Sequence, residues 1–489
     1  MQKISEGIPE FKVFEKEIYK IMCQIACELI SECLEVWDLM TLAERDAGEY
    51  RMVNKGTTTV KTVMGEVRYT RRCYRMKAGG HVYLLDEALG LGGGCGLMSE
   101  NLVEHIVMEC SDKSFRKAAE SISGLTGQSI SPMGAWNALK GFSERLEKQE
   151  DRLEELDRAG DTGRLGNIAS PALFVELDGV WISRQHVTRR GKDGGEAAAK
   201  RWRIGKRPMN IGTAYTGWSQ GKGGGHATVD KFAYASYDGA ERFGGRFEAL
   251  LRHRFDMDGV KGLVANGDGD GWIKAFADRV DAVLQLDPYH RHQAIIRAVG
   301  DKADRRRLYD AIGERDADRV LATIGEMIAE TRDEATLDKL GGLLRYFSSN
   351  RESLFTWRER GMELPAPPEG VTYRGLGTQE SSNCNILTLR MKRRKGSWTE
   401  KGANNMARIL CYRHTVGFDV MLGILPEAVG CGHPTEPLSA AKAPFRDGKG
   451  DGGGWMRADM PFDQTFRTNG RRAIRGLLGQ RPLSDLRGI

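Results

Sequence analysis

Residues 173–178 read LFVELD and residues 262–268 read GLVANGD, so two apolar runs each end in an aspartate. Short apolar runs of this kind are typical of buried strands, and an acid directly after one is expected at the carboxyl edge of a sheet. Burying an unpaired carboxylate costs several kcal/mol. Asp178 and Asp268 therefore each need a cation, a hydrogen bond or solvent, and a shared divalent metal ion would satisfy both.

The sequence around these two runs predicts an α/β domain. Further strands are predicted at residues 180–183, 210–215, 228–237, 260–265 and 282–286, and helices at 240–254 and from Trp272 onward. Three early strands followed by alternating helices and strands favour a mixed sheet covered by helices. Residues 291–360 lack proline and place apolar residues at helical spacing, which predicts an all-α insertion.

The N-terminal third predicts a separate α+β region. Residues 11–44 have the pattern of one long amphipathic helix for packing or self-association, and residues 57–64 and 67–76 predict a basic hairpin around Gly65. Helices are expected at 101–110, 114–125 and 132–146, the last beginning at Ser131-Pro132. Two interpretations stay open: a helix-turn-helix that offers Asn137 and Lys140 to a DNA groove, or an ordinary three-helix bundle. Residues 147–164 predict a solvated charged helix and linker.

Length and composition set the limits of these interpretations. A chain of 489 residues suggests about three domains, and 40% hydrophobic with 29% charged residues is ordinary for a globular protein. No apolar run approaches the roughly 18 residues of a membrane span, and the N-terminus lacks a secretory signal pattern. Nine scattered cysteines fit reduced thiols, and Cys23 with Cys27 has no second pair to complete a zinc site. We expect a cytoplasmic, nucleoid-associated protein.

Positive charge is concentrated in one segment. The net charge of +6 is mild, but residues 184–207 hold nine Lys or Arg against two acids, a local +7. Such a patch predicts contacts with nucleic acid. A second basic stretch, residues 390–395, has two interpretations: contacts with a DNA backbone or a solvated charged face. The residues predicted to contact DNA, besides Asn137 and Lys140, are Arg68, Arg71, Arg72, Arg189, Arg190, Arg201, Arg203, Lys392, Arg393 and Arg394.

A third acid completes a candidate reaction centre. Glu380 lies in the polar sequence GTQESSN, residues 377–383, which could begin a helix directed back at the sheet. Three carboxylates can hold two hard cations about 3.5–4 Å apart, which suits phosphoryl transfer without a covalent enzyme intermediate. The chain has 67 acids, so position alone does not distinguish this trio.

Two neighbouring motifs bear on the same edge. Asp287 and His290 follow the predicted strand 282–286, and two interpretations stay open: they position substrate or support the acids, or the lone histidine is structural. The GDGDG sequence at 267–271 resembles a calcium loop, but Trp272 and Ile273 occupy positions where that loop needs an oxygen ligand and a glycine. Trp272, like Asp287 and His290, is predicted to support the acids or to position substrate. The glycine run at 92–96 lacks the Gly-Lys-Ser/Thr of a phosphate-binding loop.

The chain resembles the ISLre-type insertion-sequence transposases of bacteria, which are allied to the Mutator-like transposases. The matching sequences span about residues 50–410: TVKTVMGEVRYTRRCYR (59–75), YLLDEALGL (83–91), FRKAA (115–119), ELDGVWIS (176–183), NGDGDGWIK (266–274), QLDPYH (285–290), ESSN (380–383) and WTEKGANNMA (398–407). Their order is more specific than any one of them. The zinc-knuckle-like segment that such proteins often carry before the hairpin is missing from this sequence.

This resemblance implies a ribonuclease-H-like catalytic domain with Asp178, Asp268 and Glu380 as an acidic triad that binds Mg²⁺, or alternatively Mn²⁺. Asp287 and His290 match an acid-or-cysteine, two residues, histidine motif of the Mutator relatives. The implied partners are transposon terminal repeats and target DNA, bound by a homodimer or larger assembly. The alternatives are a catalytically silent DNA-binding protein and a structure-selective nuclease.

The expected organisation has seven segments. They are an N-terminal helix (1–48), a basic hairpin region (49–98), a helical DNA-binding domain with linker (99–165), the first part of the catalytic domain (166–290), the all-α insertion (291–370), the last part of the catalytic domain (371–439) and a Gly/Arg-rich tail (440–489).

Overall fold

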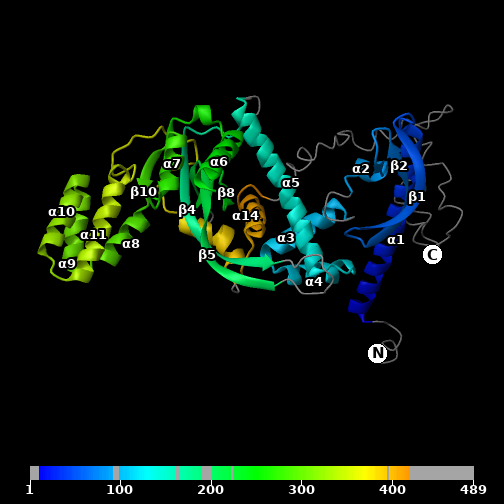
Figure 1. The fold of residues 1–489 in the computed structure, drawn as a ribbon, viewed down its shortest axis with the longest axis horizontal. Coiled ribbons are helices and arrows are strands. Elements are labelled where there is room, and N and C mark those ends of the chain that lie inside the picture. Colours follow the sequence, from blue (N-terminus) through cyan, green and yellow to red (C-terminus); the bar gives the residue numbers. More distant parts are fainter. Residues whose placement is uncertain are drawn as a thin grey trace. The chain divides into compact units, whose positions relative to one another are not determined.

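The computed structural model describes residues 10–91, 98–160, 166–188, 200–221, 224–393 and 396–417 (Figure 1). Arg189, Arg190, Arg394 and the predicted tail lie outside these residues. The chain divides into two compact units, Met1–Phe142 with Val429–Ile489 and Ser143–Ala428, which are described separately. Within the described part of the chain, no helix is long and apolar enough to cross a membrane.

The first unit is built on the predicted long helix, α1 (Phe11–Glu44). It packs against the hairpin of β1 (Tyr50–Lys61) and β2 (Glu66–Met76), to which β3 (His81–Val82) adds a third antiparallel strand. The hairpin turn requires Gly65, because its φ is +148° and a Cβ there would lie 2.8 Å from the Cys27 sulfur. Apolar side chains of α1, the hairpin and α2 (Leu84–Ala88) form the core beneath it.

Three helices follow in the order that the sequence predicts. Serines cap α3 (Glu100–Asp112) and α4 (Phe115–Thr126), since Ser99 and Ser114 accept hydrogen bonds from the backbone NH groups of Leu102 and Lys117. Gly127 ends α4 in the left-handed conformation that glycine tolerates. α3 and α4 pack together, an arrangement common to a helix-turn-helix and to a helical bundle.

The last of these helices, α5 (Pro132–Arg158), continues well beyond the predicted end at 146 and contributes residues to both units. The expectation that residues 147–158 form a solvated face was wrong for Glu150, whose side chain is fully buried. Its carboxylate accepts hydrogen bonds from Arg408 Nε at 2.9 Å and from Arg246 at 3.4 Å. Two distant arginines therefore allow α5 to pack through a charged position.

The second unit is organised around a mixed five-stranded sheet with the order β10-β9-β4-β5-β8. Its strands are β4 (Ala172–Thr188), β5 (Lys200–Tyr215), β8 (Phe232–Ser236), β9 (Gly262–Gly267) and β10 (Val283–Leu286). β4, β5 and β8 form an antiparallel meander, whereas β9 and β10 run parallel to β4. The prediction of a mixed α/β sheet is confirmed.

Helices cover this sheet. α6 (Ala240–Arg254), as predicted, packs with α7 (Gly271–Arg279) and presses Phe247 against Gly212 of β5. α12 (Gln379–Asn383) contacts β4, and α14 (Glu400–Thr415) contacts β8. Between them lie the π-helical turn Cys384–Thr388 and α13 (Leu389–Met391). A small hairpin, β6 (Gly217–Gln220) with β7 (His226–Val229), and the short 3₁₀ turn Met257–Gly259 complete the domain.

Of the basic segment, residues 184–188 and 200–207 form strands. β4 and β5 stay paired from Phe174 opposite Tyr215 to Thr188 opposite Lys200. Because β8 pairs only with residues 210–214 of β5 and β9 only with 172–176 of β4, the remaining pairs extend as a two-stranded ribbon past the sheet. We call residues 180–188 with 200–209 the β4–β5 ribbon. It is visible in Figure 1 as the long pair of arrows.

The predicted helical insertion follows β10. It comprises α8 (Pro288–Ala298), α9 (Lys302–Gly313), α10 (Ala317–Glu330) and α11 (Glu334–Ser349), packed around a core of their own. Each begins at an aspartate whose side chain accepts backbone hydrogen bonds: Asp287, Asp301, Asp316 and Asp333. The helical prediction was too long, because after Ser349 only the 3₁₀ turn Arg351–Ser353 precedes an irregular return to α12.

Candidate active site

The two predicted aspartates lie on adjacent strands, Asp268 just after the end of β9 and Asp178 within β4. The prediction that Asp178 ends a strand was wrong, because β4 continues through residues 180–183 to Thr188. β4 and β9 are parallel with Glu176 opposite Asn266, so Asp178 and Asp268, two residues farther along, reach the same level on adjacent strands. Both side chains are half-buried. Asp178 accepts hydrogen bonds from the Gly179 NH at 2.7 Å and from Asn383 Nδ2 at 2.5 Å.

Asp268 lies on a turn that the insertion holds in place. Its carboxylate accepts from the Asp270 NH at 2.9 Å, and its carbonyl accepts from the Tyr346 hydroxyl of α11 at 2.7 Å. Gly269, with φ at +87°, is required because a Cβ would lie 2.3 Å from Asn350 Oδ1. The helical insertion thus supports the backbone that presents the second aspartate.

Charge at this edge favours a cation. Burial raises the pKa of the Asp268 carboxyl, and the Asp270 and Asp178 carboxylates raise it further. The hydrogen bond from the Asp270 NH and the charge of His290 act in the opposite direction but do not cancel this rise. Like charges therefore gather where burial already disfavours ionisation, and oxygen ligands of this type suit a hard divalent ion. Among the described residues, however, no three His, Cys, Asp or Glu side chains are arranged to hold a metal ion.

Glu380 shares a short helix with Asn383, which contacts Asp178. α12 carries Glu380 and, three residues later on the same helical face, Asn383. Asn383 donates to Asp178, whereas the Glu380 side chain is exposed. Lys231, just before β8, donates from Nζ to the Ser382 hydroxyl at 2.8 Å and gives α12 a further attachment. The structure brings this helix to Asp178 but not the Glu380 carboxylate itself.

Glu176 is a residue that the sequence interpretation missed. Its side chain is fully buried in β4, and Tyr215 donates to it at 2.6 Å. Burial, together with the Glu176 charge, raises the pKa of Tyr215 well above its usual range, so this phenol remains a donor. Glu176 also accepts hydrogen bonds from Asn266 and from the backbone that leads into α12. No local signal reveals this role in an apolar run.

The motif of Asp287 and His290 is connected to the same network. Asp287 is buried, caps α8 through the Tyr289 NH at 2.7 Å, and accepts from Asn266 Nδ2 at 2.6 Å. His290 is half-buried, and its charge lowers the pKa of Asp268. Trp272 instead packs edge-on against Phe243 of α6, with ring centroids 5.3 Å apart. The structure therefore places Asp287 and His290 at the acidic edge and Trp272 in contact with a covering helix.

The predicted DNA contacts fall into different environments. Arg68, Arg203, Lys392 and Arg393 are exposed, as is Asn137, and Lys140 is half-buried. Two residues require correction: Arg72 is buried in an ion pair with Asp38, and Arg71 pairs with Asp86 while its guanidinium lies 3.9 Å from the Tyr83 ring centroid. Neither is presented to a partner. The backbone of Arg201 pairs with Val187 in the β4–β5 ribbon.

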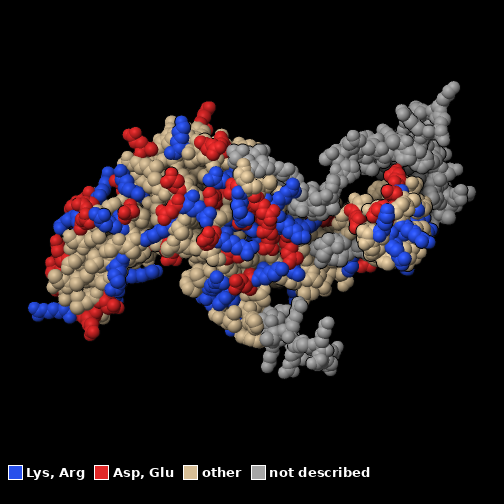
Figure 2. All heavy atoms as spheres, turned by 45° about the horizontal axis from the view of Figure 1, so that its top comes forward, with Lys and Arg blue, Asp and Glu red and all other residues tan. Residues whose placement is uncertain are grey.

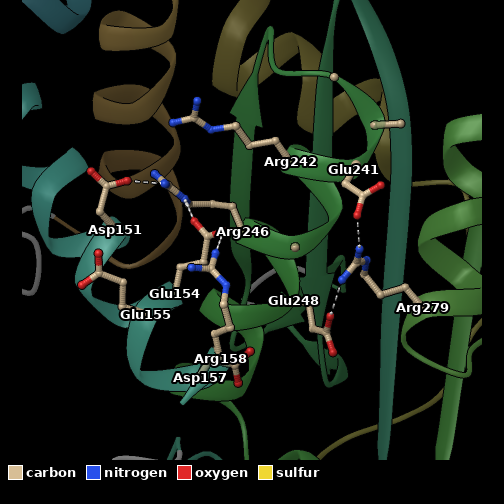
Figure 3. Close-up of a pocket in the computed structure, with 13 residues that line it drawn as sticks. Asp151, Glu154, Glu155, Asp157, Arg158, Glu241, Arg242, Arg246, Glu248 and Arg279 are labelled. Carbon is tan, nitrogen blue, oxygen red and sulfur yellow. Dashed lines mark hydrogen bonds and ion pairs between the residues drawn. The ribbon is translucent and has the colours of Figure 1, made fainter. Parts of the chain in front are cut away.

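A charged pocket lies away from the aspartates, among the described residues of α5 and α6. A pocket of about 890 Å³ is lined by α5 and α6 residues together with Arg279, and Figure 3 shows Arg246 directed at Asp151 and Glu154 and Arg279 at Glu241 and Glu248. On the face drawn in Figure 2, acidic and basic side chains are likewise interspersed. The Arg246 ion pairs join α6 to α5 and the Arg279 ion pairs join α7 to α6, so these charges stabilise the packing of the helices.

The fold and site together define an α/β protein with a mixed five-stranded sheet and an acidic edge. The chain belongs to the family described as Uncharacterised protein family (UPF0236), which it matches over residues 4–420. A UPF0236 protein in the vanSb 3′ region of Streptococcus gallolyticus is 23% identical over 435 residues, covering 86% of each chain. One from Caldanaerobacter subterraneus subsp. tengcongensis is 22% identical over 409 residues, covering 82% of this chain and 77% of the relative.

The comparison with solved structures gives a likeness to a pre-cleavage Mos1 transpososome. It has 12% sequence identity and covers 52% of this chain and 78% of that chain, with a TM-score of 0.13. That score is too low to assign a fold.

Proposed function

We propose that this protein is a DNA transposase whose reaction centre lies at the carboxyl end of β9, beside Asp178 of β4. The observation that carries the proposal is the level placement of Asp178 and Asp268 on adjacent parallel strands. Parallel neighbours are about 4.8 Å apart, so these carboxylates can share a cation. The strand order, an antiparallel meander followed by two parallel crossover strands, supports a ribonuclease-H-like assignment.

Asp178, Asp268 and Glu380 would hold Mg²⁺ or Mn²⁺. When bound, such an ion supplies charge stabilisation for the attacking and leaving oxygens of a phosphodiester. The protein residues fix the geometry: Asn383 orients Asp178, the Asp270 NH orients Asp268, and α12 carries Glu380 to the same edge. Glu380 is exposed on α12, and the proposal requires its carboxylate to turn toward Asp178 when the ion binds. This assigns the β4–β5 ribbon to DNA contact, and pairing two transposon ends suggests a dimer or larger assembly.

The name of a relative independently supports the proposal that this gene belongs to a mobile DNA element. The name of the Caldanaerobacter relative carries eleven locus designations from one strain. A protein encoded at many loci of one genome is typical of mobile elements. The resemblance to ISLre-type transposases, carried by the sequences around the three acids, agrees with this interpretation.

The test is cleavage and joining of the DNA that flanks this reading frame, with Mg²⁺ present. Asp178→Asn, Asp268→Asn and Glu380→Gln should each reduce nicking on the order of a hundredfold or more, because each removes charge from the reaction centre. Asp281→Asn is the matched control: Asp281 is exposed just before β10, and asparagine tolerates its φ of 53°. Full activity in any of the three variants would refute the triad, and cutting of branched DNA without joining would instead identify a nuclease.

A further inference from the structure

The Glu176 carboxylate accepts hydrogen bonds from six donors. Oε1 accepts from the Tyr215 hydroxyl at 2.6 Å, the Thr378 NH at 3.0 Å and the Thr378 hydroxyl at 2.5 Å. Oε2 accepts from Asn266 Nδ2 at 3.2 Å, the Gly377 NH at 3.0 Å and the Gln379 NH at 3.3 Å. An ionised carboxylate only accepts hydrogen bonds and has about four lone-pair sites on its two oxygens, so the six donors occupy all of them and some share a site. Glu176 is therefore a buried anion held by hydrogen bonds.

Three of the six donors are consecutive backbone NH groups at residues 377–379. These residues lead directly into Glu380, and their partner lies about 200 positions earlier in the chain. Hydrogen bonds to a charged group are stronger than neutral ones and are costly to leave unmade when buried. Glu176 thus fixes the start of α12 to the middle of β4.

This attachment matters because residues of the proposed reaction centre follow closely on both segments: Asp178 after Glu176, and Glu380 after residues 377–379. Glu176 and Asp178 are on the same face of β4, and residues 377–379 precede the turn that carries Glu380 and Asn383. Asn383 then donates to Asp178. A strand and a short helix are therefore joined at two points, and Glu380 lies between them. The distance between Asp178 and the third acid is set by this pair of attachments.

The same anion reaches the other elements of the site through Asn266. Asn266 Nδ2 donates to both Glu176 and Asp287, and its Oδ1 accepts from Gln285 at 2.8 Å. Asp287 in turn caps the helix that carries His290. A buried, hydrogen-bonded row thus crosses β5, β4, β9 and β10 directly beneath the acidic edge.

We propose that Glu176 is a positioning residue: it acts through the backbone of residues 377–379 to hold Glu380 and Asn383 in register with Asp178. This rests on the proposed function for its catalytic consequence. Glu176 itself touches neither DNA nor a metal ion, since its side chain is fully buried.

Glu176→Gln tests the proposal, because the amide places a donor against donors while keeping the shape of the side chain. In the full chain, amide hydrogen exchange of residues 376–384 should accelerate on the order of tenfold or more, with β4 and β9 unchanged. Mn²⁺ affinity and nicking of the flanking DNA should fall with it, whereas DNA affinity should not. Unchanged exchange at 376–384, or accelerated exchange with wild-type nicking, would overturn the positioning role.

A milder pair of variants protects the test against a misfolded Glu176→Gln protein. Thr378→Val removes one hydroxyl donor and should produce the same changes at smaller size, and Thr378→Ser retains the hydroxyl and should restore wild-type exchange. Equal exchange in the two variants would count against the proposal. A wild-type chain that neither binds Mn²⁺ nor nicks DNA would overturn the proposed function and the catalytic role of Glu176 together, whereas the exchange result separates the two.

Discussion

Two antiparallel pairs of strands carry arginines that the sequence predicts to contact DNA, and the arginines of the two pairs differ in burial and in ion pairing. In the β1–β2 hairpin, Arg72 and Arg71 turn inward to Asp38 and Asp86. The β4–β5 ribbon contains six Lys or Arg and no acid. In the described part of the chain, Glu400 forms ion pairs with Arg184 and Arg207 near its base, while Arg203 and Lys206 are exposed.

The difference indicates that the arginines of a basic strand stay exposed where the elements packed on it offer no acids to pair with them. The acids of the first hairpin come from α1 and α2, which pack on it. Their carboxylates make the hairpin arginines part of a folded core, where an unpaired partner would be costly. The β4–β5 ribbon extends past the part of the sheet that β8 and β9 pair with, and the proposed function assigns its charge to phosphate contacts.

The largest expected effect is on the first hairpin. Arg72→Met should lower the free energy of unfolding by about 3–5 kcal/mol, because it leaves the buried Asp38 carboxylate without its cation. Urea denaturation followed by circular dichroism measures this. Arg75→Met, at an exposed position on the same strand, is the control and should change stability by about 0.5 kcal/mol or less. Equal stability of the two variants would remove the distinction between the hairpins, and Asp38→Asn combined with Arg72→Met should recover part of the loss.

A smaller effect is expected on the β4–β5 ribbon. Changing Arg203 and Lys206 together to alanine should weaken binding of the flanking duplex about tenfold and reduce the salt slope of log K by about 2, one phosphate contact each. Their partners Gln185 and Ser183 place both on one face of the ribbon. Thermal stability should not change.

The matched control for this double variant removes the same charge elsewhere. Lys302 and Arg306 are exposed on α9 of the helical insertion. Changing both to alanine should leave the salt slope as it is in the wild type. If the control and the ribbon variant weaken binding equally, net charge rather than the ribbon determines affinity.

Sequence reasoning succeeded where the signal was local. The apolar runs correctly identified β9 and its end before Asp268, and helical periodicity gave the bounds of α1 and α6, whereas Asp178 lies within β4 and not at its end. It failed where the partner was remote. Glu176 lies inside an apolar run and its donors come from β5, β9 and the segment before α12. Likewise, the burial of Glu150 depends on Arg246 and Arg408, which are 96 and 258 residues away.

The smallest expected effect concerns two arginines of the first hairpin, one exposed and one buried. Arg68 is exposed on β2, four residues before the buried Arg72. Arg68→Gln should leave the unfolding free energy within about 0.5 kcal/mol of wild type and reduce the salt slope of DNA binding by about 1. Folded Arg72→Met protein should bind DNA with the wild-type slope, because a side chain paired inside the fold neutralises no phosphate. A slope unchanged by Arg68→Gln would make this hairpin wholly structural and leave the predicted phosphate contacts to the β4–β5 ribbon and the other exposed basic residues.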